Sequence, residues 1–514
     1  MRLAERLKAE GRPYVLCVGL LTAVGFLARL AYLFYPVQPD EAQSYVLYAS
    51  RSLAYGLSHY THPNNHPLNT VLTFVSTRLF GSGPVGLRLP ALVLGTLLVP
   101  LTYLVARKLY NKRVALLACA LVAGGSRALV VYSAQSRGYI AQAFLFMCVV
   151  LCALYIKRDG KGWVAFAAFS FLAFYALPTT AYFFGAVALW LLVSALLGDV
   201  AGDRGAFLRK WALACAAVIA TAFLAYLPFV LTTGLSSLTS NTFVRSLPIG
   251  TFLKDTPWSL GRLYVEWSGG ILVYVFGVFL IGFLISVLFH RNMSADRVNL
   301  ALVVLAWCAL VLIVQRVIPF SRVWLPLLPL FFAFSSAGLV YAAGRVAGLA
   351  FRGKEVHVRP YLFPLVAFGL ALLLLVAVIP SDAFSRDRNR LLESWGDYGV
   401  MDHGRIASEL KGVLEDGDLV YAGGLTRTLM GYYFEREGIP LSFLYGDWPG
   451  VRPVDPDDVK RVIIVTDSNR LVFANAVSQS NLELNRDFPL VERVSPDGEA
   501  FELYIFDVPD LDGE

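Results

Sequence analysis

Two adjacent carboxylates, Asp40 and Glu41, lie in the sequence PVQPDEAQSY, directly after the first long apolar segment of the chain. Pro36 and Pro39 end a helix at this point. Two neighbouring acidic side chains at the rim of an apolar segment cost free energy unless they are paired, so they are retained where they are paired or take part in a reaction. Only 11 of the 37 acidic residues lie in residues 1–380, so few other carboxylates are available. The pair is therefore the first candidate for a general base, and a solvated loop pair is the alternative.

Three of the six histidines, His59, His62 and His66, lie within eight residues of one another in HYTHPNNHPLNTVL. A zinc site is one interpretation, but Pro63 and Pro67 break any helix, and no Cys or Glu nearby completes a ligand set. We favour a loop that binds an anion or forms hydrogen bonds.

Two arginines, Arg137 in YSAQSRGY and Arg322 in PFSRVWLPLLP, each stand at the start of an apolar segment. An arginine at such a position can simply extend toward lipid headgroups. The guanidinium group also matches the geometry of a phosphate. Together with the carboxylates and histidines, these arginines indicate a site for a substrate with an anionic head and an apolar tail.

The elements that position these residues are membrane helices. Hydrophobic residues make up 57% of the 514 residues, charged residues 16%, and the mean hydropathy is +0.60. Soluble domains have about 45–50% apolar and about 25% charged residues, so a soluble enzyme is excluded. A bilayer is crossed by about 20 apolar residues. We expect eleven such spans, near residues 14–35, 87–106, 114–132, 138–156, 162–177, 179–198, 211–232, 270–289, 299–317, 323–344 and 361–380. The shorter apolar stretch 68–80 is expected in the interface.

Clusters of Lys and Arg follow every second predicted span and set the orientation. They lie near residues 107–113, 157–161, 204–210, 291–297 and 345–359. Cytoplasmic loops are enriched in these residues, so we place the N-terminus in the cytoplasm of a cell (inner or plasma) membrane. With an odd number of spans, the C-terminal part lies outside the cytoplasm.

The C-terminal part, residues 381–514, has a different composition, with 26 acids and 13 bases. The segments DGDLVYAGG, VKRVIIVTDS and FELYIFDV predict strands, and HGRIASELKGVL predicts a helix. We therefore expect a membrane domain at 1–380, with its first external loop at about 36–86, and a small extracytoplasmic α/β domain at 381–514. The sequence of this domain favours an accessory lid or docking function. Nucleic-acid binding is not expected, because the excess basic residues report membrane topology.

Four motifs in order resemble the polyprenyl-phosphate-sugar glycosyltransferases of the GT-C superfamily. They are the acidic pair at 40–41, NNHPLNTVL with RLFG, LRLPALVLGTLLVPLTYLVARKLY followed by YSAQSRGYIAQAF, and SRVWLPLLPLF. The chain is most similar to the family-39 branch, which includes protein O-mannosyltransferases and the lipid A aminoarabinose transferase. The specific similarity covers roughly residues 36–150.

The resemblance implies inverting transfer of a hexosyl or pentosyl group from a polyprenyl-phosphate donor to a lipid, glycan or protein acceptor on the outer face. It implies that Asp40 is the general base and that Glu41 positions the acceptor. It further implies that Arg137 and Arg322 neutralise the donor phosphate and that His66, or His62 in another register, faces that phosphate. The expected substrate pocket also includes Tyr45, Tyr139, Glu266 and Trp267.

Some features differ from the family pattern or leave alternatives open. The loop reads His-Pro-Leu-Asn instead of the family's His-Pro-Pro-Leu, and no D-x-D motif lies in the first loop. No cofactor and no metal site are expected, although a requirement for a divalent metal stays open. A transporter or flippase of a lipid-linked anion is the alternative function. It is less favoured, because transporters place ionisable groups at the midplane of repeated halves. A scaffold that binds partners through the acidic C-terminal part is a further alternative.

Overall fold

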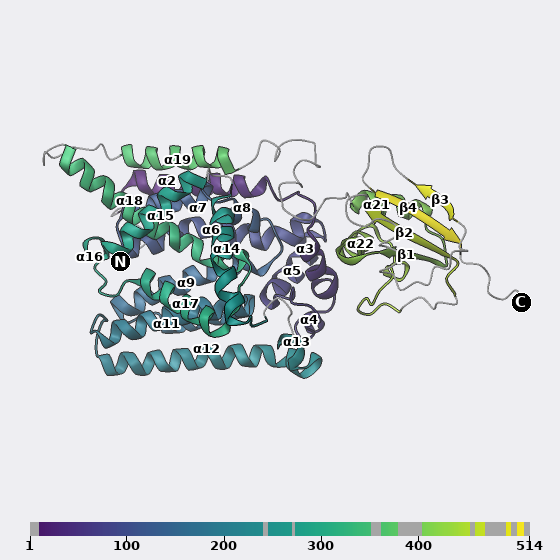
Figure 1. Cartoon of the computed structure of the whole chain (residues 1–514), viewed down its shortest axis with the longest axis horizontal. Coiled ribbons are helices and arrows are strands. Elements are labelled where there is room, and N and C mark those ends of the chain that lie inside the picture. The colour runs from purple at the N-terminus through teal and green to yellow at the C-terminus, as the bar shows by residue number, and fades with distance from the viewer. Residues whose placement is uncertain are drawn as a thin grey trace, which may run out of the picture. The chain divides into compact units, whose positions relative to one another are not determined.

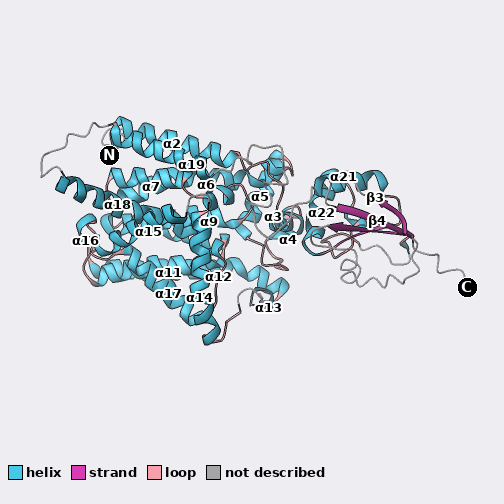
Figure 2. Ribbon diagram, turned by 45° about the horizontal axis from the view of Figure 1, so that its top comes forward, coloured by secondary structure: helices cyan, strands magenta, loops and turns pink. Residues whose placement is uncertain are grey.

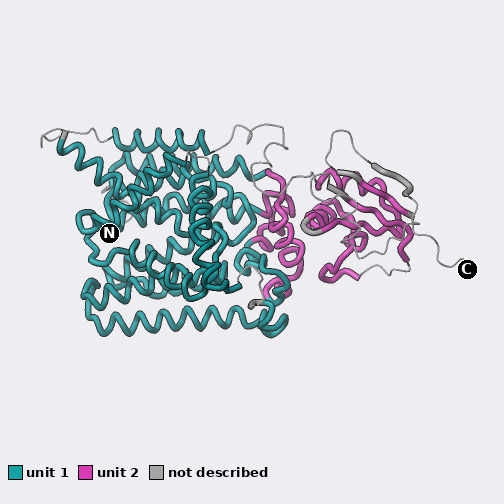
Figure 3. The backbone as a smooth tube through the Cα atoms, viewed as in Figure 1, with its two compact units in different colours: residues 1–34, 58–72, 88–380 teal, residues 35–57, 73–87, 381–514 magenta. Residues whose placement is uncertain are grey.

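The computed structural model describes residues 10–239, 245–269, 273–350, 361–378, 403–452, 458–467, 490–494 and 501–507. The chain divides into two compact units (Figure 3). Unit 1 comprises residues 1–34, 58–72 and 88–380, and unit 2 comprises residues 35–57, 73–87 and 381–514. The first external loop, expected as part of the membrane domain, is thus shared between the two units.

Unit 1 is a helical body (Figures 1 and 2). Its first helices are α2 (Arg12–Leu30), α5 (Pro67–Phe80), α6 (Pro84–Leu109), α7 (Lys112–Gly124), α8 (Arg127–Tyr132), α9 (Gly138–Asp159), α10 (Trp163–Ala176), η2 (Pro178–Thr180) and α11 (Ala181–Leu196). The residues of α5 and α6 between 73 and 87 belong to unit 2. They are followed by α12 (Arg204–Thr233), α13 (Leu235–Thr239), α14 (Ile249–Ser268), α15 (Val273–Leu288), α16 (His290–Met293), α17 (Leu300–Gln315), η4 (Ser321–Leu327), α18 (Leu328–Ala350) and α19 (Leu362–Val378).

These helices make the chain an integral membrane protein. Among the described residues, six helices are long and apolar enough to cross a bilayer, and the bent pair α14–α15 adds a seventh. Three shorter apolar helices are α10, α17 and α19. Every segment expected to span overlaps a helix, but the segment 114–132 is divided between α7 and α8. The number eleven therefore stays a prediction.

Helix α14 was not expected from the sequence. It meets α15 at an angle of 105°. Apolar residues of α14 are exposed, including Leu253 and Trp258, while Phe252 is buried. The sequence signal was an amphipathic pattern, which a search for continuous apolar runs does not detect.

Helix α9 connects two groups of polar side chains. Its 22 residues span about 33 Å at 1.5 Å per residue, similar to the thickness of the hydrocarbon core of a bilayer. It ends at Gly160, whose φ of 67° is the left-handed conformation that glycine adopts most easily. One polar group surrounds the start of α9, and the other surrounds its end.

The group at the end of α9 is an ion-pair network. Lys157, 2% exposed, donates to Asp199 at 2.7 Å and to Asp296 at 2.6 Å. Arg158 donates to Asp296 at 2.9 Å. Burial acts to raise the pKa of Asp296, but the bonds and charges of Lys157 and Arg158 outweigh it and hold this pKa below its ordinary value. The network therefore ties α9 to the loops that precede α12 and α17.

Unit 2 contains a four-stranded sheet in the order β1-β2-β4-β3. Strand β1 runs parallel to β2, whereas β4 runs antiparallel to both β2 and β3. The elements of unit 2 are α3 (Pro39–Ser44), the π-helix η1 (Tyr45–Ala49), α4 (Leu53–Gly56), α21 (His403–Val413), β1 (Asp418–Ala422), α22 (Gly424–Glu437), η6 (Leu441–Phe443), β2 (Arg461–Asp467), β3 (Leu490–Val494) and β4 (Phe501–Asp507). The three predicted strands and the helix at 403–413 are confirmed, whereas β3 and α22 were not expected from the sequence.

The core of unit 2 combines residues that are distant in the sequence. Residues of β1, β2, β4, α21 and α22 share one buried apolar cluster with Val37, Ala42, Tyr45, Val46, Ala49 and Leu87. The segment that includes Asp40 and Glu41 is therefore packed into the core of the C-terminal domain.

Candidate functional site

His66 lies immediately before α5 and is 3% exposed. Its Nδ1 accepts a hydrogen bond of 3.0 Å from the backbone N–H of Gly138, the first residue of α9. Burial lowers the pKa of His66 to about 3, and the positive charge of Arg322 also contributes. The imidazole is therefore neutral at physiological pH, and its proton is assigned to Nε2 because Nδ1 is an acceptor.

Tyr139 lies at the centre of this polar group. Its ring is 5.4 Å from the ring of His66, in an edge-to-face arrangement. Its hydroxyl accepts a hydrogen bond of 3.1 Å from Nε of Arg322, at the start of η4. The guanidinium of Arg137 is 5.1 Å from the centre of the same ring. The structure thus brings together four residues that the sequence analysis selected, from three separate segments.

The two guanidinium groups are held by neighbouring side chains. Arg137 donates to Oδ1 of Asn64 at 2.8 Å and is 5% exposed. Arg322 stacks on Phe320, with 4.4 Å between its guanidinium carbon and the ring centre. Two positive charges beside a neutral imidazole donor are suited to an anion such as a phosphate.

His62 occupies a different environment from His66. It lies on the exposed turn 61–63, and its backbone carbonyl accepts a hydrogen bond from the N–H of Asn65. Asn65 is buried and is bonded to Thr70 in the first turns of α5. Of the two histidines that could face the donor phosphate, His66 is the one that lies beside Tyr139. Within the described ranges, no group of three His, Cys, Asp or Glu residues is arranged to hold a metal ion.

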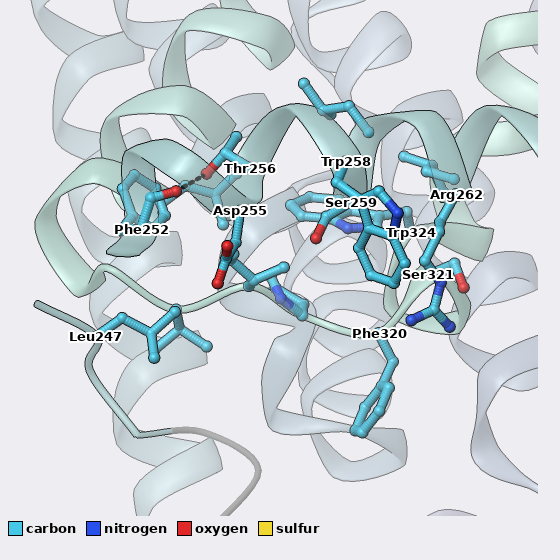
Figure 4. Close-up of a pocket in the computed structure, with 16 residues that line it drawn as sticks. Leu247, Phe252, Asp255, Thr256, Trp258, Ser259, Arg262, Phe320, Ser321 and Trp324 are labelled. Carbon is cyan, nitrogen blue, oxygen red and sulfur yellow. Dashed lines mark hydrogen bonds between the residues drawn. The ribbon is translucent and has the colours of Figure 1, made fainter. Parts of the chain in front are cut away.

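A cavity of about 490 Å³ is lined by residues of α14, the end of α17 and the start of η4 (Figure 4). Ser321, which precedes Arg322, lines it together with Asp255 and Arg262. In the view of Figure 4, Asp255 and Arg262 lie toward opposite ends of this cavity. Asp255 and Arg262 are not among the site residues expected from the sequence, because their position on an amphipathic helix was not anticipated.

A second cavity of about 710 Å³ shares lining residues with the first, including Phe252, Leu263 and Trp324. Its other walls come from α14, α15, α17 and α18 and are apolar, with Trp267 among them. The first cavity is lined by two charged side chains, Asp255 and Arg262, and it shares a wall with an apolar cavity. This combination matches a ligand that has a charged head and a hydrocarbon tail.

Glu266 and Trp267, at the end of α14, contact different partners. The hydroxyl of Ser321 donates to the carboxylate of Glu266, and Arg262 lies 3.8 Å from the same carboxylate. The indole of Trp267 packs on Phe331 at 5.5 Å. Glu266 thus connects α14 with the segment that starts at Ser321 and includes Arg322.

Asp40 and Glu41 belong to unit 2, in the first turn of α3. Glu41 is fully buried and accepts a hydrogen bond of 3.0 Å from the backbone N–H of Gln38, which forms a capping box. Asp40 is partly exposed. Glu41 therefore stabilises the helical turn that presents Asp40, and its contact with an acceptor stays a prediction. Tyr45, also expected in the substrate pocket, packs on Tyr432.

Comparisons with known proteins agree with the resemblance found in the motifs. Residues 61–227 match the family described as dolichyl-phosphate-mannose-protein mannosyltransferase. This range includes His66, Arg137 and Tyr139. No curated protein sequence matches the chain significantly.

The fold is similar to that of solved GT-C enzymes. ArnT from Cupriavidus metallidurans in the apo state matches with a TM-score of 0.60 and 15% identity, over 96% of this chain and 97% of that chain. The same protein bound to undecaprenyl phosphate matches with a TM-score of 0.60 and 15% identity, over 97% of this chain and 99% of that chain. The oligosaccharyltransferase of Archaeoglobus fulgidus, in complex with zinc and sulfate, matches with a TM-score of 0.55 and 14% identity, over 89% of this chain and 68% of that chain. The predicted resemblance to the GT-C superfamily is confirmed.

Proposed function

We propose that this chain is an integral-membrane glycosyltransferase that moves a sugar from a polyprenyl-phosphate donor to an acceptor on the extracytoplasmic face. One observation carries the proposal: Arg137 and Arg322 gather around Tyr139, beside the neutral imidazole of His66. The residue before Arg322 lines a cavity that shares a wall with a larger apolar cavity. This arrangement supports a donor with a phosphate head and an isoprenoid tail.

The donor phosphate is proposed to bind at the two arginines, with the isoprenoid tail in the apolar cavity. The similarity to ArnT from Cupriavidus metallidurans, a structure of which holds undecaprenyl phosphate, supports this class of donor. We assign the end of α9 with the Lys157 network to the cytoplasmic side of the plasma membrane, because residues of three predicted basic clusters meet there. They are Lys108, Lys157, Arg158 and Arg297. The arginine site and the C-terminal domain then belong to the outer side.

The proposed reaction transfers the sugar with inversion at its anomeric carbon. The Asp40 carboxylate accepts the proton of the acceptor hydroxyl or amine. The acceptor atom forms a bond to the anomeric carbon while the bond from that carbon to the phosphate oxygen breaks. The leaving group changes from a phosphodiester to a phosphomonoester and gains negative charge. Arg137 and Arg322 stabilise this charge as it develops, which lowers the barrier.

The remaining selected residues have proposed supporting functions. Glu41 holds the turn that presents Asp40 and is proposed to orient the acceptor, and Glu266 orients the segment that includes Arg322. Tyr139 and Trp267 are proposed to contact the donor. The acceptor is a lipid, a glycan or a protein.

The test uses purified protein in liposomes with a panel of polyprenyl-phosphate sugars and a crude acceptor extract. The measurement is the release of polyprenyl phosphate together with sugar incorporation. We expect Asp40→Asn to lower turnover by about 100-fold or more, as loss of a general base does, while the donor still binds. The matched control is Asp416→Asn, the same change on an exposed turn. Normal turnover of Asp40→Asn would disprove the assignment of the base, and transport of labelled lipid without sugar transfer would favour a flippase.

A further inference from the structure

We propose that helix α22 of the C-terminal domain is a positioning element for Asp40, with Tyr432 and Glu435 as its positioning residues. The proposal rests on the function proposed above, because it gives the C-terminal domain a task in that reaction. It replaces the expectation of an accessory lid with that of a support for the segment that presents the base.

The first observation is a shared apolar core. Ala42, Tyr45 and Val46 are 9% exposed or less and belong to the same buried cluster as Tyr432 and Phe434 of α22. The rings of Tyr45 and Tyr432 meet edge to face at 5.8 Å. Tyr45 follows Asp40 by five residues in one continuous helical segment, or about 7.5 Å along the axis. A shift of Tyr45 therefore displaces Asp40.

The second observation is a pair of polar contacts on either side of this core. The hydroxyl of Tyr432 donates to the backbone carbonyl of Ser82 at 2.9 Å. Glu435 forms an ion pair with Arg51 at 3.0 Å, and both side chains are about one-fifth exposed. The hydroxyl of Ser50, at the end of η1, donates to the backbone carbonyl of Val46 at 3.1 Å. Burial raises the pKa of Glu435 above its ordinary value, and the opposing effects of Arg51 and Ser50 are smaller. The partly desolvated Glu435 carboxylate, paired with Arg51, restricts the chain at the end of η1.

The third observation is that η1 is a π-helix of five residues, Tyr45–Ala49. Such segments are rarer and less stable than an α-helix, so they persist where surrounding contacts hold them. Here the contacts come from Arg51, whose Nε donates to the Val46 carbonyl, and from Arg78, which donates to the carbonyls of Ala49 and Arg51. Arg51 thus connects the π-helix with Glu435 of α22.

The consequence for catalysis is geometric. A displacement of about 1 Å in a reacting group lowers a rate by up to about 100-fold. The donor site belongs to unit 1, so loss of the α22 contacts should lower kcat and leave the KM for the donor unchanged. A residue with a purely structural task in the domain would lower the amount of folded protein and leave kcat per folded molecule unchanged.

The experiment combines hydrogen–deuterium exchange with kinetics on the full-length protein in nanodiscs. The variants are Glu435→Gln and Tyr432→Phe, which preserve side-chain volume, and Tyr432→Ala, which removes the ring. The control is Glu437→Gln, two residues further along α22 and so on another side of the helix. We expect faster exchange in peptides from residues 35–57 for Glu435→Gln and Tyr432→Ala, with exchange in α9 unchanged.

In turnover assays we expect kcat to fall about 3- to 10-fold for Glu435→Gln, with the donor KM within about twofold of wild type. Glu435→Asp should recover part of the loss, because it keeps the charge beside Arg51. Unchanged exchange in residues 35–57 for both Glu435→Gln and Tyr432→Ala would overturn the proposal, as would a loss of donor affinity with kcat unchanged. The two proposals can fail separately. If the variants show faster exchange in residues 35–57 but the wild-type protein transfers no sugar, α22 anchors this segment and the proposed function is rejected.

Discussion

Removal of the Arg322 side-chain charge should weaken binding of polyprenyl phosphate by about 10- to 150-fold. The estimate comes from the loss of one hydrogen bond to a charged group, about 1.5–3 kcal/mol. The relevant change is Arg322→Gln, which keeps a polar side chain of similar length. The Tyr139 hydroxyl accepts from Nε of Arg322 at 3.1 Å, so Tyr139→Phe tests how much of the affinity depends on holding Arg322 in place.

Tyr139→Phe keeps the ring that contacts His66 and Arg137 and removes only the hydroxyl. A neutral hydrogen bond contributes about 0.5–1.5 kcal/mol, so we expect binding to weaken by about 2- to 10-fold. If the hydroxyl acts through Arg322, the Phe substitution should have no further effect in the Arg322→Gln background.

The assay is equilibrium binding of labelled short-chain polyprenyl phosphate to protein in detergent at several salt concentrations. Arg113→Gln is the matched control, because Arg113 is exposed at the start of α7. Affinity of Arg322→Gln within twofold of wild type would refute a phosphate site at Arg322. Full additivity of the two substitutions would show that the Tyr139 hydroxyl contributes to donor binding independently of Arg322.

Three further predictions concern stability, each measured by thermal or denaturant unfolding in detergent. Gly138→Ala should destabilise the protein by about 1–3 kcal/mol, because the added Cβ would lie 2.9 Å from the Ala176 carbonyl oxygen and 3.1 Å from Nδ1 of His66. Gly19→Ala, with open space around it, is the control, and equal effects of the two substitutions would contradict this packing. The pKa of His66 is about 3 in the folded state and 6.5 ordinarily, so the unfolded state binds the proton first as the pH falls. The free energy of unfolding should therefore decrease as the pH drops from 6.5 toward 3, by about 2 kcal/mol at pH 5. An unchanged pH dependence of stability in His66→Gln would be inconsistent with this. Asp296→Asn should lower the free energy of unfolding by about 3 kcal/mol, since Lys157 stays buried with one carboxylate partner fewer. A decrease below about 0.5 kcal/mol would show that the ion-pair network does not stabilise the fold.

Local patterns in the sequence were sufficient to predict the helices and to select the candidate residues at their ends. Each expected apolar span overlaps a helix, since a bilayer requires every backbone polar group in the span to be bonded within its own segment. Three strands of the C-terminal domain followed from short β-rich runs between turn residues. The candidates Asp40, His66, Arg137 and Arg322 followed from the rarity of charged and polar side chains in an apolar chain.

Tertiary structure alone decided which of these residues meet. Arg137 contacts Asn64 across 73 positions, and Arg322 contacts Tyr139 across 183. The sequence did not show whether His62 or His66 lies beside Tyr139. That placement depends on the hydrogen bond from the backbone N–H of Gly138, the first residue of α9, to His66. Nor could it show that the segment presenting Asp40 shares a core with α22. Hydropathy and helix signals act over a few turns of one segment, whereas packing selects partners by the shapes of distant surfaces that meet only when the chain has folded.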